Sequence, residues 1–151
     1  MAEFAHALTL STPYTQVSSG ESFQIPIKID EVENLAGLRL VVKYDADMLE
    51  YEQSIQAKAV ESLMHISNNK RPGLVIIVMA GAKGIKGKNC PLLWIQFKAK
   101  PDLKKKHELK LEVANLQLMN EQLRDLKAET QMNSIVVLPA DVQGHKKKAK
   151  N

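Results

Sequence analysis

The side chains best suited to hold a metal ion are four histidines and one cysteine. His6, His65, His107 and His145 lie far apart in the sequence, and Cys90 has no second cysteine. Zinc sites need such ligands at short, regular spacing, and no pair here has it. We therefore expect no metal site and no cofactor, and no neighbouring residue marks Cys90 as a nucleophile.

Two pairs of carboxylates suggest calcium binding or glycoside hydrolysis. Asp45 and Asp47 lack the correctly placed glycine and terminal glutamate of an EF-hand loop. Glu50 and Glu52 would lie on the same side of one strand, whereas the acid pair of a glycosidase faces across a cleft. Because short Asp side chains favour turns, we predict a turn at Asp45. We predict no catalytic residue and no enzyme.

Stacking of sugar rings on exposed aromatic side chains is a third possible chemistry. The chain has three Phe, three Tyr and one Trp. Strand alternation assigns three of them to the core: Phe23, Tyr44 and Phe97. Trp94 is then the main candidate for a sugar site, with Tyr14 or Tyr51 beside it. A carbohydrate-binding module for polysaccharide is an alternative function, and it requires two or three coplanar exposed rings.

The elements that would position these residues are predicted to be strands. From Leu38 to Tyr44 apolar and polar residues alternate, which is typical of a strand with one buried face. The stretches 23–29 and 92–98 alternate in the same way, and Pro26 predicts a free edge or a bulge. The segment 74–79 is apolar at every position, so its outer face must be covered or must bind something.

Other segments are less regular. Helix formers between residues 56 and 63 predict a turn or two of helix, and the glycines and lysines of 80–88 predict a flexible loop. The stretch 107–126 fits strand alternation and helical spacing about equally well. About nine strands at short spacing predict an all-β, antiparallel sandwich with one short helix.

Three motifs give the chain a resemblance to cohesin domains, the β-sandwich receptors of cellulosome scaffolds. They are a glycine-led strand from Gly20 to Asp30, the sequence Tyr44-Asp45 followed by Leu49-Glu50, and the strand 92–100. The resemblance covers roughly residues 6–138 and implies a nine-stranded sandwich of jelly-roll topology. It also favours an extended 107–119, a turn or short helix at 120–125, and a closing strand at 131–138.

The resemblance implies a non-enzymatic protein–protein interaction module that binds a dockerin-type partner through one sheet face. Carried across by motif, the expected partner-binding residues lie on three strands: Gly37, Arg39 and Val41; His65 and Ser67; Ile76 and Val78. Many family members have small polar or acidic residues where Gly37 and Arg39 stand, which leaves the identity of the partner open. A structural spacer in a larger surface or secretion protein is a further alternative, and it predicts no apolar outer face.

Size and charge limit the remaining possibilities. The 151 residues suit one domain, expected over 1–140, with a net charge of +4 and a basic tail or linker over 141–151. The lysine runs lack interleaved aromatics, so we expect no nucleic-acid partner. No apolar run is long enough to span a membrane, and no signal peptide opens the chain. We expect an extracellular or cell-surface module excised from a larger protein, present as a monomer or weak dimer.

Overall fold

The computed structural model describes residues 8–140, most of which are in β-strands. The predicted basic tail, residues 141–151, lies outside the described residues. One helical element is present in the described part, a single 3-10 turn at Lys58–Val60 where a short helix was predicted. The strands are β1 (Leu8–Thr12), β2 (Thr15–Ser18), β3 (Ser22–Lys43), β4 (Leu49–Gln56), β5 (Met64–Asn68), β6 (Leu74–Ala99), β7 (His107–Leu109), β8 (Glu112–Met119), β9 (Asp125–Leu126), β10 (Ala128–Met132) and β11 (Ile135–Leu138).

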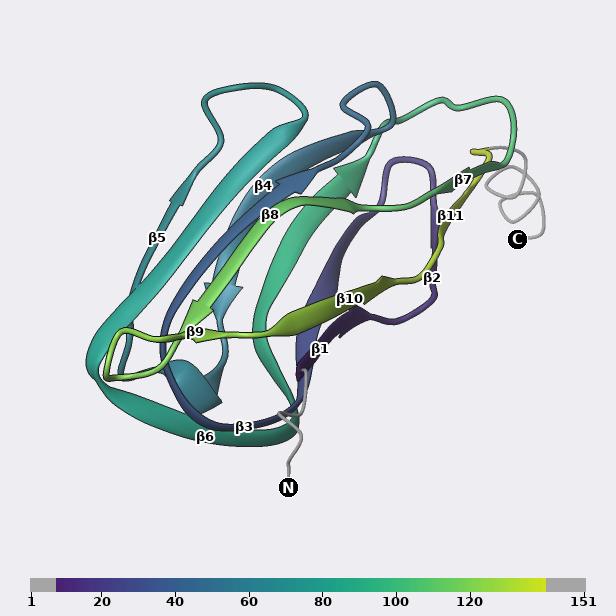
Figure 1. The fold of residues 1–151 in the computed structure, drawn as a ribbon. Coiled ribbons are helices and arrows are strands. Elements are labelled where there is room, and N and C mark those ends of the chain that lie inside the picture. Colours follow the sequence, from purple (N-terminus) through teal and green to yellow (C-terminus); the bar gives the residue numbers. More distant parts are fainter. Residues whose placement is uncertain (1–7, 141–151) are drawn as a thin grey trace.

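Two long strands, β3 and β6, connect the two layers of the sandwich. They pair with each other along most of their length and bend together at one end of the molecule (Figure 1). The register between them shifts near Val32 and Leu35, and such β-bulges are what allow a strand to bend. We call the two layers layer A and layer B, and we define each by the half of β3 and the half of β6 that it contains.

Layer A contains the second half of β3 and the first half of β6. β8 flanks β3, β5 flanks β6, and β9 extends the layer beyond β8. Layer B contains the other halves, with β1 beside β3, β10 beside β1, and β4 beside β6. A small third sheet of β2, β11 and β7 lies at the opposite end from the bend (Figure 1).

The core lies between the two layers. Leu38, Leu40 and Val42 in layer A are buried, as their alternation predicts. They belong to one cluster with the inward residues of layer B, among them Ile25, Ile27, Ile29, Leu93 and Ile95. Phe97 is fully buried, and the rings of Phe23, Tyr44 and Tyr51 surround it at centroid distances of 6.1, 5.1 and 6.2 Å. The all-β sandwich is thereby confirmed.

Three details differ from the sequence-based expectation. β1 pairs in parallel with β10, and β2 pairs in parallel with β11, whereas the sequence predicted an antiparallel sandwich. The predicted loop at 80–88 is part of β6, since pairing of Ile85 and Gly87 with β3 keeps it extended. Simple alternation within 92–98 predicts that Leu92 faces outward with Trp94 and Gln96, but Leu92 is buried because the register shifts between Ile27 and Lys28. Within residues 8–140, no helix is long and apolar enough to cross a membrane.

Candidate binding face

The outer face of layer A is a regular lattice of side chains. In an antiparallel sheet, residues paired directly across strands point to the same side. The pairing of β8, β3, β6 and β5 therefore defines three outward rows: Met119, Gly37, Ala80 and Met64; Gln117, Arg39, Val78 and Ile66; Asn115, Val41, Ile76 and Asn68. Strand spacing and rise make this lattice about 14 Å by about 14 Å between its outermost Cα atoms. We call these twelve residues the binding face.

The structure brings five of the seven predicted partner-binding residues together on this face. Gly37, Arg39 and Val41 follow one another along β3, while Val78 and Ile76 are the β6 neighbours of Arg39 and Val41. Arg39 is exposed, and Ile76 and Val78 are half-buried. Val41 lies between Asn115 and Ile76 and is only 8% exposed. The role of these residues in binding is taken up below.

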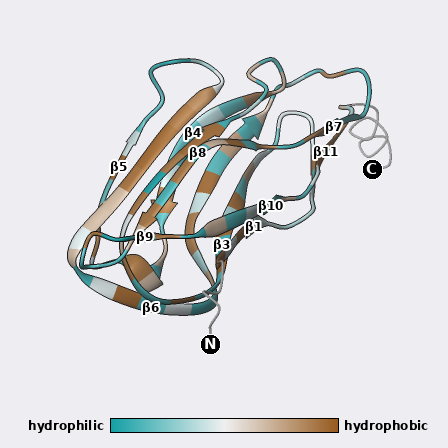
Figure 2. Ribbon diagram, in the orientation of Figure 1, coloured by the Kyte–Doolittle hydropathy of each residue, from teal (hydrophilic) through white to brown (hydrophobic). Residues whose placement is uncertain are grey.

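The binding face is mainly apolar along β5 and β6, apart from Asn68, and mainly polar along β8, apart from Met119. Met64 and Ile66 are 57% and 53% exposed, which is unusual for large apolar side chains. Figure 2 shows the continuous hydrophobic start of β6 beside β5, whereas most other strands alternate. On the other side, Arg39 Nη1 donates a hydrogen bond of 2.7 Å to Asn115 Oδ1. The face thus has an apolar half and a polar half that contains one cation.

His65 and Ser67 do not lie with the other predicted residues, which corrects that expectation. β5 pairs with β6 so that His65 and Ser67 stand beside Met79 and Ile77, whose side chains point into the core. Their side chains instead contact β4: Ser54 Oγ lies 2.9 Å from His65 Nε2, and Tyr51 Oη donates to Ser67 Oγ at 3.3 Å. The outward positions of β5 are Met64, Ile66 and Asn68.

The Ser54–His65 contact brings a hydroxyl and an imidazole together, as in a serine nucleophile and its base. Burial lowers the pKa of His65, which favours the neutral ring. A hydrolase also needs a carboxylate to orient the imidazole, and no carboxylate among the described residues is bonded to His65. The pair therefore fastens β5 to β4 rather than forming a triad.

In both carboxylate pairs considered from the sequence, a side-chain oxygen accepts a hydrogen bond from a nearby protein group. Asp45 Oδ1 accepts a bond of 2.9 Å from the Asp47 amide, which is the turn chemistry predicted for this segment. Glu52 Oε1 accepts a bond of 2.7 Å from Gln96 Nε2 on the outer face of layer B. Among residues 8–140, no group of three or more His, Cys, Asp or Glu side chains is arranged to hold a metal ion.

The outer face of layer B has a different character. Gln96 Oε1 accepts bonds from the side-chain amides of Gln24 and Gln53 at 3.1 and 3.3 Å, so these polar groups satisfy one another. Trp94 lies on this face, between Pro26 and Ile55, and is half-buried. Of the aromatic residues in 8–140, Tyr14 alone is exposed, at 58%. The described residues therefore do not form the coplanar aromatic platform that a carbohydrate-binding module requires.

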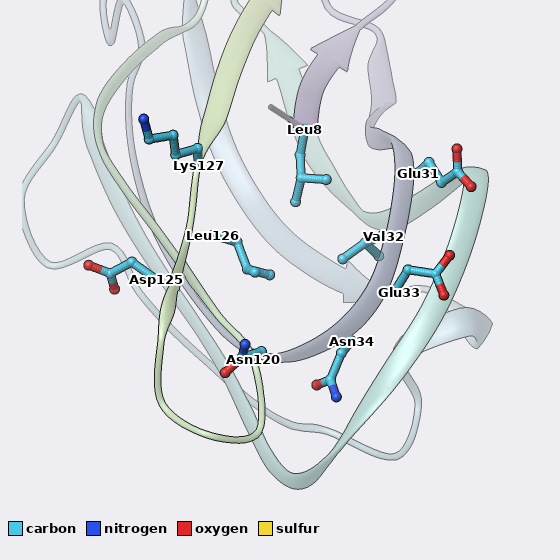
Figure 3. A pocket seen from close by; sticks show the side chains of 9 residues that line it. All are labelled: Leu8, Glu31, Val32, Glu33, Asn34, Asn120, Asp125, Leu126 and Lys127. Atoms are coloured by element: carbon cyan, nitrogen blue, oxygen red, sulfur yellow. The ribbon is translucent and has the colours of Figure 1, made fainter. Parts of the chain in front are cut away.

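An open groove of about 710 Å³ lies at the bend, where β9 passes β3. Figure 3 shows Leu8, Val32 and Leu126 pointing toward one another inside it, whereas Glu31 and Glu33 point away. A small-molecule site normally has polar groups that converge on the ligand. This groove offers apolar contact without them.

Comparison with known proteins adds a family match. A protein-family model described as the cohesin domain matches residues 8–137. No curated protein sequence matches the chain.

Several solved structures share the fold. A non-cellulosomal cohesin from Archaeoglobus fulgidus is 17% identical, with 93% of this chain and 98% of that one covered and a TM-score of 0.74. The sixth cohesin of Acetivibrio cellulolyticus scaffoldin B, solved with a Cel5 dockerin mutant, is 15% identical over 86% and 98% of the chains, with a TM-score of 0.78. A cohesin in a type I cohesin–dockerin complex from Clostridium thermocellum is 14% identical over 91% and 98%, also with a TM-score of 0.78.

Proposed function

Since the chain belongs to the cohesin family, we propose that it binds a dockerin-type protein through the outer face of layer A. Cohesins are non-enzymatic protein-binding modules. Two of the structurally similar cohesins were solved as complexes with dockerins. The proposed contact residues are Gly37, Arg39, Val41, Ile76 and Val78, to which the register of β5 adds Met64 and Ile66.

The observation that carries this proposal is the difference between the two outer faces. Met64 and Ile66 are exposed next to the half-buried Val78 and Ile76, so this surface keeps apolar area in water. The outer face of layer B instead carries glutamines that bond one another. Exposed apolar patches with polar rims are typical of protein-interaction sites. The function of a structural spacer does not require such an exposed apolar patch.

The binding mechanism follows from the rigidity of the surface. All four strands of the binding face are paired, so partner binding orders no backbone segment. Burial of the apolar half contributes roughly 25 cal/mol per Å² of apolar area removed from water. Because the surface is preformed, ordering of this chain on binding offsets little of that free energy.

The test is binding of the full chain to recombinant dockerin modules encoded in its source genome, measured by isothermal titration calorimetry. Ile66→Asp places a charge in the apolar half and is expected to weaken binding by on the order of 100-fold. Tyr14→Asp is the matched control, because Tyr14 is as exposed as Ile66 but adjoins the small third sheet.

The control variant should bind like the wild type. Equal loss in both variants, or no binding of any dockerin module by the wild type, would contradict the proposal.

We also infer an extracellular or cell-surface location, because cohesins are typically surface modules of scaffoldins. The folded domain is proposed to span residues 1–140, with the basic segment 141–151 as a tail or linker. Release of the chain by brief protease treatment of intact cells would support this location, and its recovery only after lysis would contradict it.

A further inference from the structure

We propose that Arg39 selects the partner by binding a carboxylate that the partner places next to an apolar side chain. This inference rests on the proposed function, and it concerns the chemistry of the partner rather than the existence of binding. The resulting partner would be a dockerin-type module with an acidic residue in its contact surface.

The guanidinium of Arg39 has most of its hydrogen-bonding capacity free. An arginine has five N–H donors, and the described residues accept from one nitrogen of Arg39, through Asn115 Oδ1 at 2.7 Å. No carboxylate within residues 8–140 forms an ion pair with it. The bond to Asn115 holds one edge of the guanidinium, which leaves the remaining donors to face a ligand.

The surroundings of Arg39 make it the central charge of the binding face. Its neighbours in the row are Val78 and Gln117, both uncharged. Lys43 lies farther along β3, directly across from Glu112, so that opposite charges stand side by side there. Asp125, at the β9 edge, accepts a bond of 3.2 Å from Gln117 Nε2. The middle of the face therefore presents a single positive group.

A partner that covers Arg39 must replace the water that solvates it. Burial of an unpaired charge is strongly unfavourable, so a well-fitting partner has to supply a negative or strongly accepting group. A carboxylate matches the guanidinium fork with two parallel hydrogen bonds, which makes it the best-suited side chain. The polar β8 side of the face would tolerate the approach of such a group.

The spacing of the strands also sets the distance between Arg39 and the apolar side chains in its row. Val78 and Ile66 lie in the same row as Arg39, one and two strands away. This places apolar surface about 5 to about 10 Å from the cation. Residues three or four apart on one side of a helix are about 6 Å apart, so a partner helix with an acidic residue and an apolar residue at that spacing fits the row.

The test uses charge reversal on both sides of the complex. In the dockerin module that binds the wild-type chain, each acidic residue is changed to lysine and titrated against wild type and against Arg39→Glu. Arg39→Glu should weaken wild-type dockerin binding by on the order of 100-fold, and one acidic-to-lysine variant should restore binding to Arg39→Glu but not to the wild type.

The matched control is Lys43→Glu, which changes charge on the same strand and is expected to change affinity by no more than a few-fold. Circular dichroism of each variant checks that the fold is retained.

The outcomes separate the two claims. If Arg39→Glu binds like the wild type while Ile66→Asp does not, the selectivity inference is wrong and the binding face stands. If Arg39→Glu weakens binding but no acidic-to-lysine variant of the partner restores it, the ligand of Arg39 is not a carboxylate. If no dockerin module binds the wild type, both claims fall.

Discussion

At the scale of single residues, Gly84 shows how close packing constrains the bend between the layers. Its amide donates a hydrogen bond of 2.8 Å to Glu121 Oε1, and the amide of Glu121 donates one of 2.9 Å to Asn34 Oδ1. A Cβ atom on Gly84 would overlap the side chain of Asn34 and lie 3.1 Å from its Cα. A glycine is therefore needed at this position for a steric reason rather than for its dihedral angles.

Gly84→Ala is expected to lower the free energy of unfolding by about 1–3 kcal/mol, the usual cost of overpacking. Urea denaturation followed by circular dichroism measures it. Gly37→Ala is the matched control, because a Cβ there would meet Met119 Cβ at 3.7 Å and Met79 O at 3.9 Å, which are ordinary contacts. A loss in Gly37→Ala as large as in Gly84→Ala would refute the steric explanation.

At the scale of elements, β5 links the binding face to the core. It is an edge strand that pairs with β6 on one side, while His65 and Ser67 reach β4 on the other. Its outward side presents Met64 and Ile66. The neutral imidazole of His65 is thus part of what holds the apolar half of the binding face in place.

This arrangement predicts a pH dependence of stability. Burial lowers the pKa of His65 in the folded state below its ordinary value of 6.5, so the unfolded chain binds the proton first as the pH falls. The contribution of His65 to stability is therefore fully present above pH 6.5 and is lost as the pH falls from there through the folded-state pKa. Urea unfolding at several pH values between 7.5 and 5 should show this decrease.

His65→Gln is the control, because glutamine keeps a polar side chain on β5 but does not titrate. Its stability should change less over the same pH range than that of the wild type. An identical pH dependence in both proteins would show that His65 is not the group responsible.

At the scale of the whole molecule, the two layers share their two longest strands. β3 and β6 run through both, so neither layer can lose its pairing while the other keeps both strands intact. The inward residues of both layers also form one cluster. The sandwich should therefore unfold as a single cooperative unit, whereas two independent sheets could separate.

Cooperative unfolding can be checked with the single tryptophan. Trp94 lies on β6 in layer B and reports on that layer by fluorescence, whereas far-UV circular dichroism reports on all strands. The two signals are expected to give the same midpoint in urea, as two-state behaviour requires. A fluorescence transition at a clearly different urea concentration would indicate that the layers unfold separately.

The sequence by itself determined most of the strands, the buried side of the central one and the resemblance to cohesins. Alternation suffices at Leu38, Leu40 and Val42, because each second side chain of a half-buried strand faces the core. It also identified the apolar outer face of 74–79, since polar residues are the normal choice there.

Only the tertiary structure decided which side of β5 faces outward and where the long strands bend. In 64–68 apolar and polar residues alternate, and ordinary patterning would place the polar His65 and Ser67 outside. Pairing with β6 places Met64 and Ile66 there instead, and a change of one residue in register would reverse every side chain of the strand. Likewise, the glycines of 81–87 resemble a loop until their pairing with β3 across the bend is known. Both decisions depend on long-range partners, which local sequence does not encode.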